Sequence, residues 1–94
     1  MGKIRSFACK DTQNLFTGKP CKRWRDIRTV VERKLQLLDS AASLDALRSP
    51  PGNRLEALQG DRSGQHSVRS NQQWRLCFVW GESGVFDVEI VDYH

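Results

Sequence analysis

Two arginines and a tyrosine in the second half of the chain carry the clearest chemical signal in the sequence. Alternation along the predicted strands places Arg69, Arg75 and Tyr93 on the same face of a sheet. Two neighbouring guanidinium groups repel each other unless an anion joins them, and the planar guanidinium fork matches two phosphate oxygens. A solvated face with scattered charges is the ordinary alternative and suits Arg69 by itself. For Arg75 with Tyr93 we favour a phosphate-binding site.

The last three residues, Asp92, Tyr93 and His94, form a second chemical group. His94 titrates near neutral pH, so it can act as a base or as an acid. A tyrosine hydroxyl with its ordinary pKa of about 10 suits an acid or a stacking surface. Asp92 can orient His94 or act as a base itself. Chain ends are commonly frayed and without function, so that alternative stays open.

Cysteine and histidine, which often bind metal ions, show no metal-binding spacing here. Cys9, Cys21 and Cys77 form no Cys-x-x-Cys pair, and the two histidines add no Cys/His cluster. An odd number of cysteines also argues against a disulfide scaffold. We interpret the cysteines as small apolar thiols in a reducing cytoplasm and expect no cofactor. His66 falls on the apolar strand face, where we expect a partly buried, hydrogen-bonded ring.

Positive charge is concentrated in the first part of the chain. Residues 1–38 contain ten Lys and Arg against three Asp and Glu, a net +7, whereas residues 39–94 contain five against eight, a net −3. Such a basic segment favours a polyanionic partner, RNA or DNA. A solvated basic helix face is the alternative. The connection between the two predicted helices contributes Lys19, Lys22, Arg23 and Arg25.

Length and patterning predict one α+β domain that covers residues 1–94. The 94 residues leave no room for two domains, and no apolar run approaches the roughly 18 residues that span a bilayer. Helices are predicted at 11–17 and 27–38, and strands at 3–8, 54–58, 66–70, 74–80 and 85–93. Because the turns after residue 58 are short, neighbouring strands must be antiparallel. We expect the N-terminal strand and two helices to pack on one face of an antiparallel sheet.

The register of the last two strands follows from where the carboxylates would fall. Across the turn at 81–84, one register sets Phe78 opposite Val88, and a slip by one residue places Asp87 and Glu89 among the tryptophans. Burying these carboxylates is costly, so we expect the first register. It gathers the apolar residues of both strands on one face: Trp74, Leu76, Phe78, Trp80, Phe86, Val88 and Ile90.

This register fixes the neighbours of Arg75. Val91 lies opposite it in one neighbouring strand and Arg69 in the other, while Tyr93 is a diagonal neighbour at roughly 7–8 Å. The residues before and after Tyr93 begin on the opposite face. They join Arg75 only if the chain end curls past the strand.

Three segments, in this order and spacing, resemble the HigB toxins of the RelE/ParE superfamily. They are Leu-x-Gly-Asp-Arg at 58–62, Trp-Arg-Leu at 74–76 and Asp-Tyr-His at 92–94. The stretch Ser-Pro-Pro-Gly-Asn-Arg-Leu at 49–55 resembles one subgroup closely. The similarity extends over essentially the whole chain and implies a RelE-like fold.

The resemblance implies a ribosome-dependent endoribonuclease that cleaves mRNA without a metal ion and inhibits translation. It also implies a HigA-like helix-turn-helix antitoxin, in a complex expected to be a heterotetramer that binds operator DNA through the antitoxin. Arg75 is implied to contact the scissile phosphate, and Asp92, Tyr93 and His94 to supply catalytic or RNA-positioning groups. We expect RNA contacts from a wider set: Lys19, Lys22, Arg23, Arg25, Arg54, Gln59, Arg62 and Arg69.

Two positions depart from the pattern of the resembling family. Relatives use a histidine and a lysine where this chain has Glu56 and Gln59. The loss of a base and of a positive charge predicts weaker or slower cleavage, and it leaves open which group takes the proton from the 2′-hydroxyl. Arg54 and Arg62 can replace part of the lost charge.

Two other functions stay open at this point. ParE-like members of the same fold act on DNA gyrase, and a fold does not determine a function. A basic RNA-binding module without catalysis is the second alternative. Arg75 together with the terminal Asp-Tyr-His favours the ribonuclease.

Overall fold

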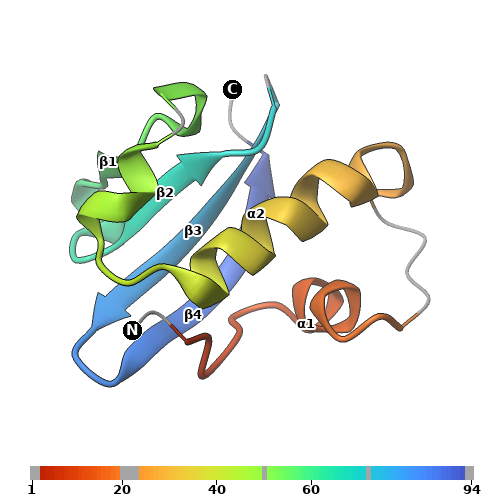
Figure 1. The fold of residues 1–94 in the computed structure, drawn as a ribbon, viewed down its shortest axis with the longest axis horizontal. Coiled ribbons are helices and arrows are strands. Elements are labelled where there is room, and N and C mark those ends of the chain that lie inside the picture. The colour runs from red at the N-terminus through yellow and green to blue at the C-terminus, as the bar shows by residue number, and fades with distance from the viewer. Residues whose placement is uncertain (1–2, 20–23, 50, 72, 93–94) are drawn as a thin grey trace.

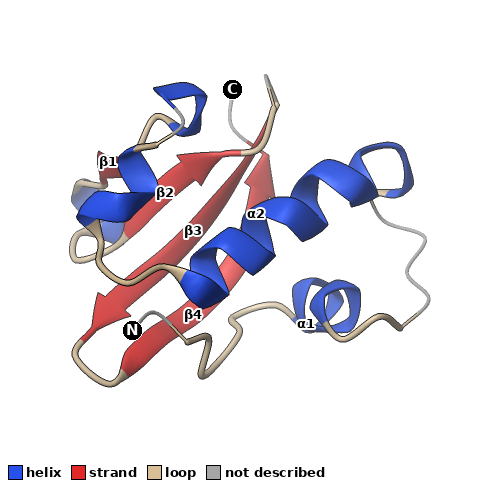
Figure 2. Ribbon diagram, viewed as in Figure 1, coloured by secondary structure: helices blue, strands red, loops and turns tan. Residues whose placement is uncertain are grey.

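In a computed structural model, the chain forms a four-stranded antiparallel sheet with helices packed on one side (Figures 1 and 2). The structure describes residues 3–19, 24–49, 51–71 and 73–92. The strands follow chain order across the sheet: β1 (Glu56–Ala57), β2 (His66–Arg69), β3 (Trp74–Gly81) and β4 (Gly84–Asp92). The two α-helices are α1 (Lys10–Phe16) and α2 (Arg28–Ser40). The α+β architecture expected from the sequence is confirmed.

Helix α2 carries the apolar stripe that the sequence predicts. Val31, Leu35 and Leu38 are fully buried and recur at steps of four and three, which places them on one side of the helix. On the outer side, Arg28 Nε donates to Glu32 Oε1 at 2.7 Å across one helical turn. Among the described residues, no helix has both the length and the apolar character to cross a membrane.

The face of the sheet that lies against the helices is apolar. Leu76 and Phe78 of β3 are completely buried, and Trp74 and Trp80 pack half-buried beside them. This is the predicted alternation, because every second residue of a strand points to the same face. A fully buried side chain of this size contributes about 1.5–3 kcal/mol relative to an exposed one. This apolar face therefore holds the sheet and the helices together.

The pairing of β3 with β4 follows the predicted register in its first half and departs from it in the second. Arg75 lies opposite Val91, as predicted, and the register shifts between Cys77 and Val79. Two residues of β4, Asp87 and Val88, then face one residue of β3, which is a β-bulge. Asp87 has a φ of 54°, so the backbone leaves the extended conformation there.

The bulge reverses the alternation in the first half of β4. Val85 is completely buried, whereas Phe86 is partly exposed and lies opposite Val79. The prediction that Phe86 shares the core face with Val88 and Ile90 is therefore wrong. The extra residue moves the strand out of step by one position, and the hydrophobic pattern alone does not reveal it.

The N-terminal segment runs parallel to β4 along its free edge. It makes two isolated bridges, the first between Ile4 and Val85, at the place where an edge strand is predicted. A continuous strand does not form there because the bulge interrupts the ladder. The N–H of Asp87 donates to the Oγ of Ser6 at 2.9 Å instead of to a main-chain carbonyl.

The remaining predicted boundaries hold with one exception. Helix α1 lies one residue before the predicted 11–17. Strand β1 has only two residues, although a strand is predicted over 54–58. The reason lies in Arg54, whose φ of 46° is incompatible with extended backbone, so the strand begins after it.

Candidate active site

Arg75 is the centre of a polar cluster on the face of the sheet that points away from the helices. It is only 4% exposed. Its Nε donates to Ser67 Oγ at 2.8 Å, and its Nη2 donates to the main-chain oxygen of Arg54 at 2.7 Å. Its Nη1 lies 3.7 Å from Glu56 Oε1. A buried guanidinium is costly unless its N–H groups find acceptors, and these contacts supply them.

Glu56 is a further member of this cluster, and its contact with Arg75 was not predicted from the sequence. Its side chain is 49% exposed, whereas that of Arg75 is 5% exposed, so the carboxylate is open to solvent and the guanidinium lies beneath it. The pairing of β1 with β2 sets Glu56 opposite Ser67 and thereby brings it beside Arg75. In the sequence, the signal for this contact is the strand predicted at 54–58, because its pairing with the next strand determines which residue lies beside Arg75.

Arg69 lies opposite Arg75 in the register, as predicted. Its Nε donates to the main-chain oxygen of Asn71 at 3.1 Å, in the turn between β2 and β3. Arg75 donates in a different direction, to Ser67 on the diagonal position. The two guanidinium groups therefore share a face but turn to different acceptors, which does not support the expected joint phosphate site.

Arg62 is paired with a carboxylate. Its Nη1 donates to Glu89 Oε1 at 2.7 Å and to Gln65 Oε1 at 3.1 Å. The hydrogen bond to Glu89 raises the pKa of Arg62, so the guanidinium stays charged. Because Glu89 compensates that charge, the idea that Arg62 replaces a lost cation is weakened. The side chains of Arg54 and Gln59 belong to exposed residues.

Cys77 lies on the same outer face and is 2% exposed. Burial raises the pKa of the Cys77 thiol, which keeps the group neutral at physiological pH. The neutral thiol is a poor nucleophile, so Cys77 fills space in the way expected of a small apolar residue. Cys9 is also a free thiol, and Cys21 lies outside the described residues.

Asp92 stands at the end of β4, opposite Trp74 of β3. Directly opposed residues project to the same face, so Asp92 begins on the face away from Arg75, as predicted. The Nε2 of Gln73 donates to Asp92 Oδ2 at 3.2 Å. Tyr93 and His94 lie outside the described residues, and their approach to Arg75 stays a prediction.

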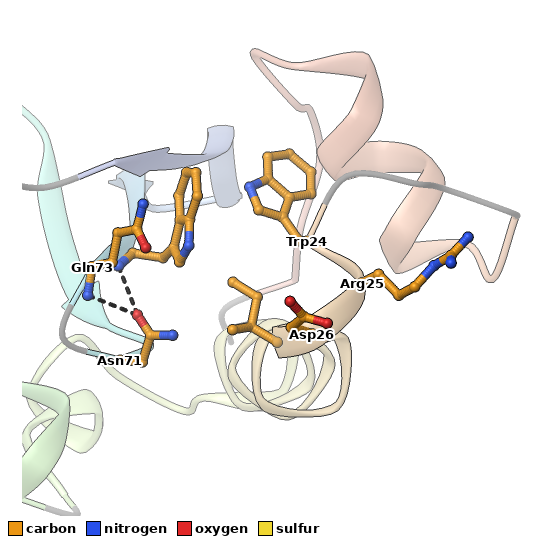
Figure 3. Close-up of a pocket in the computed structure, with 7 residues that line it drawn as sticks. Trp24, Arg25, Asp26, Asn71 and Gln73 are labelled. Carbon is orange, nitrogen blue, oxygen red and sulfur yellow. Dashed lines mark hydrogen bonds between the residues drawn. The ribbon is translucent and has the colours of Figure 1, made fainter.

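A hollow of about 380 Å³ opens next to this strand end and is lined in part by Trp24 and Trp74. Figure 3 shows Trp24, Asn71 and Gln73 around it. The two indole rings are 6.1 Å apart and nearly perpendicular. Asn71 shapes the turn beside them, because its Oδ1 accepts the N–H groups of Gln73 and Trp74, each at 2.8 Å. No local pattern in the sequence indicates this hollow, because Trp24 and Trp74 are fifty positions apart in the chain.

The basic connection is described only in part. Lys19 and Arg25 are exposed, and Arg25 lines the hollow while its side chain extends away from Trp24 (Figure 3). Lys22 and Arg23 lie outside the described residues. Contacts of this segment with RNA stay a prediction.

His66 is half-buried on the core face, with its ring 6.3 Å from that of Phe78. The expected burial is confirmed. The expected hydrogen bonding is wrong for Nδ1, which is buried and has no hydrogen-bond partner within the described part of the chain. In the same described ranges, no three His, Cys, Asp or Glu side chains come together in a group that could hold a metal ion.

The chain also matches a known protein family. The model of the HigB-like toxins, described as RelE-like toxins of the type II toxin–antitoxin system HigB, matches residues 7–94. The chain belongs to the HigB-like toxin family. This confirms the resemblance seen in the segments at 58–62, 74–76 and 92–94.

Individual relatives agree with the family. Toxin HigB-1 of Vibrio cholerae is 48% identical over 63 residues, which cover 63% of this chain and 66% of that protein. A protein of Haemophilus influenzae is 36% identical over 60% of this chain and 55% of its own length. The matches thus span less than two thirds of these two relatives. The endoribonuclease HigB of Proteus vulgaris is 29% identical over 97% of this chain and 99% of its own length.

Solved structures agree on the fold. The YoeB–YefM complex from Staphylococcus aureus contains a chain that superposes with a TM-score of 0.61 at 17% identity, covering all of this chain and 98% of that chain. At this identity the similarity shows the RelE-like fold alone. The expected fold class is thereby confirmed.

Proposed function

We propose that this protein is the toxin of a type II toxin–antitoxin system and acts as an endoribonuclease that cleaves mRNA on the ribosome, stopping translation. The observation that carries the proposal is a buried guanidinium, Arg75, held by Ser67 and Arg54 beside the half-exposed carboxylate of Glu56. The name of the Proteus vulgaris relative supports the reaction class. The family description supports the toxin role.

Cleavage through the 2′-hydroxyl needs a base, a cation and an acid. Arg75 supplies the cation that stabilises negative charge on the phosphorane, because the planar guanidinium fork matches two phosphate oxygens. Glu56 supplies the base. Its carboxylate lies 3.7 Å from Arg75 and is open to solvent, so a ribose that places its phosphate on Arg75 brings the 2′-oxygen close to it. This role for Glu56 answers the question that the missing histidine leaves open.

The acid comes from the chain end. The 2′-oxygen forms a new bond to phosphorus, the bond from phosphorus to the 5′-oxygen breaks, and the leaving 5′-oxygen takes a proton from His94 or Tyr93. In this proposal Asp92, which accepts a hydrogen bond from Gln73, orients His94. The products are a 2′,3′-cyclic phosphate and a 5′-hydroxyl.

The hollow lined in part by Trp24 and Trp74 supports an RNA substrate. Aromatic side chains stack unpaired bases, and Gln73 joins the wall of this hollow to Asp92. Basic residues of the chain add affinity through the phosphate backbone without reading sequence. They are Lys19, Lys22, Arg23, Arg25, Arg54 and Arg69.

Arg75→Ala tests the proposal. We expect the variant to lose growth arrest and mRNA cleavage in cells while it still folds and binds the antitoxin, with a lower unfolding temperature because Ser67 and Arg54 lose their donor. Arg33→Ala, which removes an exposed guanidinium from α2, is the matched control and should stay toxic. Full toxicity of Arg75→Ala would refute the proposal. Intact mRNA with DNA-damage signalling would point to gyrase instead, and ribosome binding with intact mRNA would point to a non-cleaving RNA-binding module.

Two further variants test the base and the acid. Glu56→Gln should lower the cleavage rate, because an amide cannot take the proton from the 2′-hydroxyl. Deletion of Tyr93 and His94 should abolish cleavage and leave ribosome binding in place. A truncated protein that cleaves at the wild-type rate would exclude both residues from the reaction.

The antitoxin partner follows from the same family. We propose a HigA-like helix-turn-helix antitoxin, in a heterotetramer that binds operator DNA through the antitoxin, and activity in the cytoplasm. Light scattering of the co-expressed complex gives the stoichiometry. A mass that corresponds to one toxin and one antitoxin would contradict the heterotetramer.

A further inference from the structure

We propose that Ser67 is a positioning residue for Arg75, and that its hydroxyl together with the main-chain carbonyl of Arg54 fixes the orientation in which the guanidinium meets the phosphate. The inference rests on the proposed role of Arg75 and adds what makes that role effective. Ser67 is completely buried, its Oγ accepts from Arg75 Nε at 2.8 Å, and its main-chain oxygen lies 3.5 Å from Nη2. Because Ser67 is completely buried, it cannot contact a substrate itself and acts through Arg75.

The sheet makes this contact possible because Ser67 is small. Ser67 lies opposite Cys77, and Arg75 lies opposite Arg69, so Ser67 and Arg75 are diagonal neighbours. The long side chain of Arg75 lies along the sheet over β2. A long side chain at position 67 would occupy the space that the guanidinium fills.

The second acceptor comes from an anchored, strained turn. Arg54 has a φ of 46°, in the left-handed region that residues other than glycine rarely adopt, and its carbonyl accepts from Arg75 Nη2 at 2.7 Å. The preceding Asn53 is completely buried. Its Nδ2 donates to the main-chain oxygens of Leu47 and Ser49, and its Oδ1 accepts from Lys34 of α2. Backbone strain that the surrounding structure holds in place is typical of functional sites.

These contacts hold two of the three guanidinium nitrogens of Arg75 in fixed directions. Nε and Nη2 donate to Ser67 and Arg54 inside the protein, while Nη1 lies on the side of Glu56, whose carboxylate is open to solvent. A cation whose direction is fixed before the substrate arrives does not have to be ordered in the transition state. Loss of the Ser67 hydroxyl should therefore lower kcat and leave KM almost unchanged.

The experiment measures cleavage of an in vitro transcript on purified bacterial ribosomes by Ser67→Ala, Ser67→Thr and Ser70→Ala. We expect Ser67→Ala to lower kcat by about 10–100-fold, the range for a misplaced reacting group, with KM within about twofold. Ser67→Thr keeps the hydroxyl and should recover most of kcat. Ser70→Ala is the matched control, because the Oγ of Ser70 is buried and makes no hydrogen bond within the described ranges; its activity should equal that of the wild type.

A double-variant comparison separates positioning from simple destabilisation. In an Arg75→Lys background, which has no Nε to hold in the same way, Ser67→Ala should change kcat by less than about twofold. An equal loss in both backgrounds would mean that Ser67 only supports the fold, and would overturn the inference. If Ser67→Ala does not fold, Ser67→Cys can replace it in both backgrounds, because cysteine is close to serine in size and its thiol is a weaker hydrogen-bond acceptor.

The outcome also distinguishes this inference from the proposed function. Full kcat in Ser67→Ala, with Arg75→Ala inactive, would overturn the positioning role and leave the function of Arg75 intact. Full activity of Arg75→Ala would overturn the proposed function itself.

Discussion

Neighbouring residues of β3 enter two different environments on the two faces of the sheet. Leu76 and Phe78 are completely buried against the helices, and Arg75 and Cys77, at 4% and 2% exposed, are almost equally buried on the other side. The first face is stabilised by apolar area, which is non-directional. The second is stabilised by hydrogen bonds that fix angles as well as distances. Side chains that are equally buried therefore contribute differently on the two faces. The apolar ones stabilise the fold, and the hydrogen bonds of Arg75 fix the orientation of its guanidinium.

The largest effect should come from the helix-facing side. Phe78→Ala removes a completely buried ring and should lower the free energy of unfolding by about 3–5 kcal/mol through lost transfer energy and the cavity left behind. Urea denaturation followed by circular dichroism measures it. A loss below about 1 kcal/mol would mean that this face is not the main source of stability.

On the outer face, the decrease in the free energy of unfolding should depend on whether a substitution leaves a buried hydrogen-bonding group without its partner. Arg75→Met leaves the hydroxyl of Ser67 and the carbonyl of Arg54 without their donor, which should lower the free energy of unfolding by about 1–3 kcal/mol. Adding Ser67→Val removes one of these unpaired groups, so the double variant should lose less than the sum of the two single variants. Strict additivity in the same urea experiment would contradict a pairing mechanism.

The pair of Arg62 with Glu89 lies at the solvent-exposed edge of the outer face and should contribute less to the free energy of unfolding. The side chains are 41% and 23% exposed, and a pair of this kind contributes at most about 1 kcal/mol. Arg62→Met should therefore change the free energy of unfolding by no more than that, and the change should shrink in 1 M salt because the charges are screened. A larger loss that does not depend on salt would show that this pair belongs to the buried cluster.

The smallest expected effect is the pH dependence that Cys77 contributes. Burial raises the pKa of this thiol, so above the ordinary thiol pKa of about 8.5 the unfolded chain releases a proton that the folded chain keeps. Stability from this group is complete below that pH and declines as pH rises through the folded pKa. Urea midpoints from pH 7 to 9.5 should fall more steeply for the wild type than for Cys77→Ala. Parallel slopes would mean that the thiol is not buried in solution.

How far the sequence predicts each face depends on how local the determining contacts are. The helix-facing side was foreseeable, because alternation in β3 and the stripe of Val31, Leu35 and Leu38 are local patterns. The position of Arg75 opposite Val91 followed from the cost of burying carboxylates. On the outer face the partners of Arg75 come from segments up to 21 positions away, and Glu89 is 27 positions from Arg62. No periodicity encodes such pairs.

The bulge in β4 and the contact of Glu56 with Arg75 also depend on pairing between strands, which local sequence patterns do not reveal. Phe86 was misplaced because one additional residue near Asp87 changes the phase of the strand without leaving a mark in the hydrophobic pattern. The family pattern indicates only that Glu56 stands where relatives have a histidine, and therefore predicts the loss of a base. Its contact with Arg75 depends on the pairing of β1 with β2, which the structure supplies.

The irregularity in β4 also constrains how this protein can change length. The N-terminal segment pairs with β4 on both sides of Asp87, at Ile4 with Val85 and at Phe7 with Val88, so both segments advance by three residues between the two bridges. Removing Asp87 alone would leave the N-terminal segment one residue too long for its partner. Insertions and deletions in these two segments, whose bridged residues are 81 positions apart, should therefore occur as matched pairs.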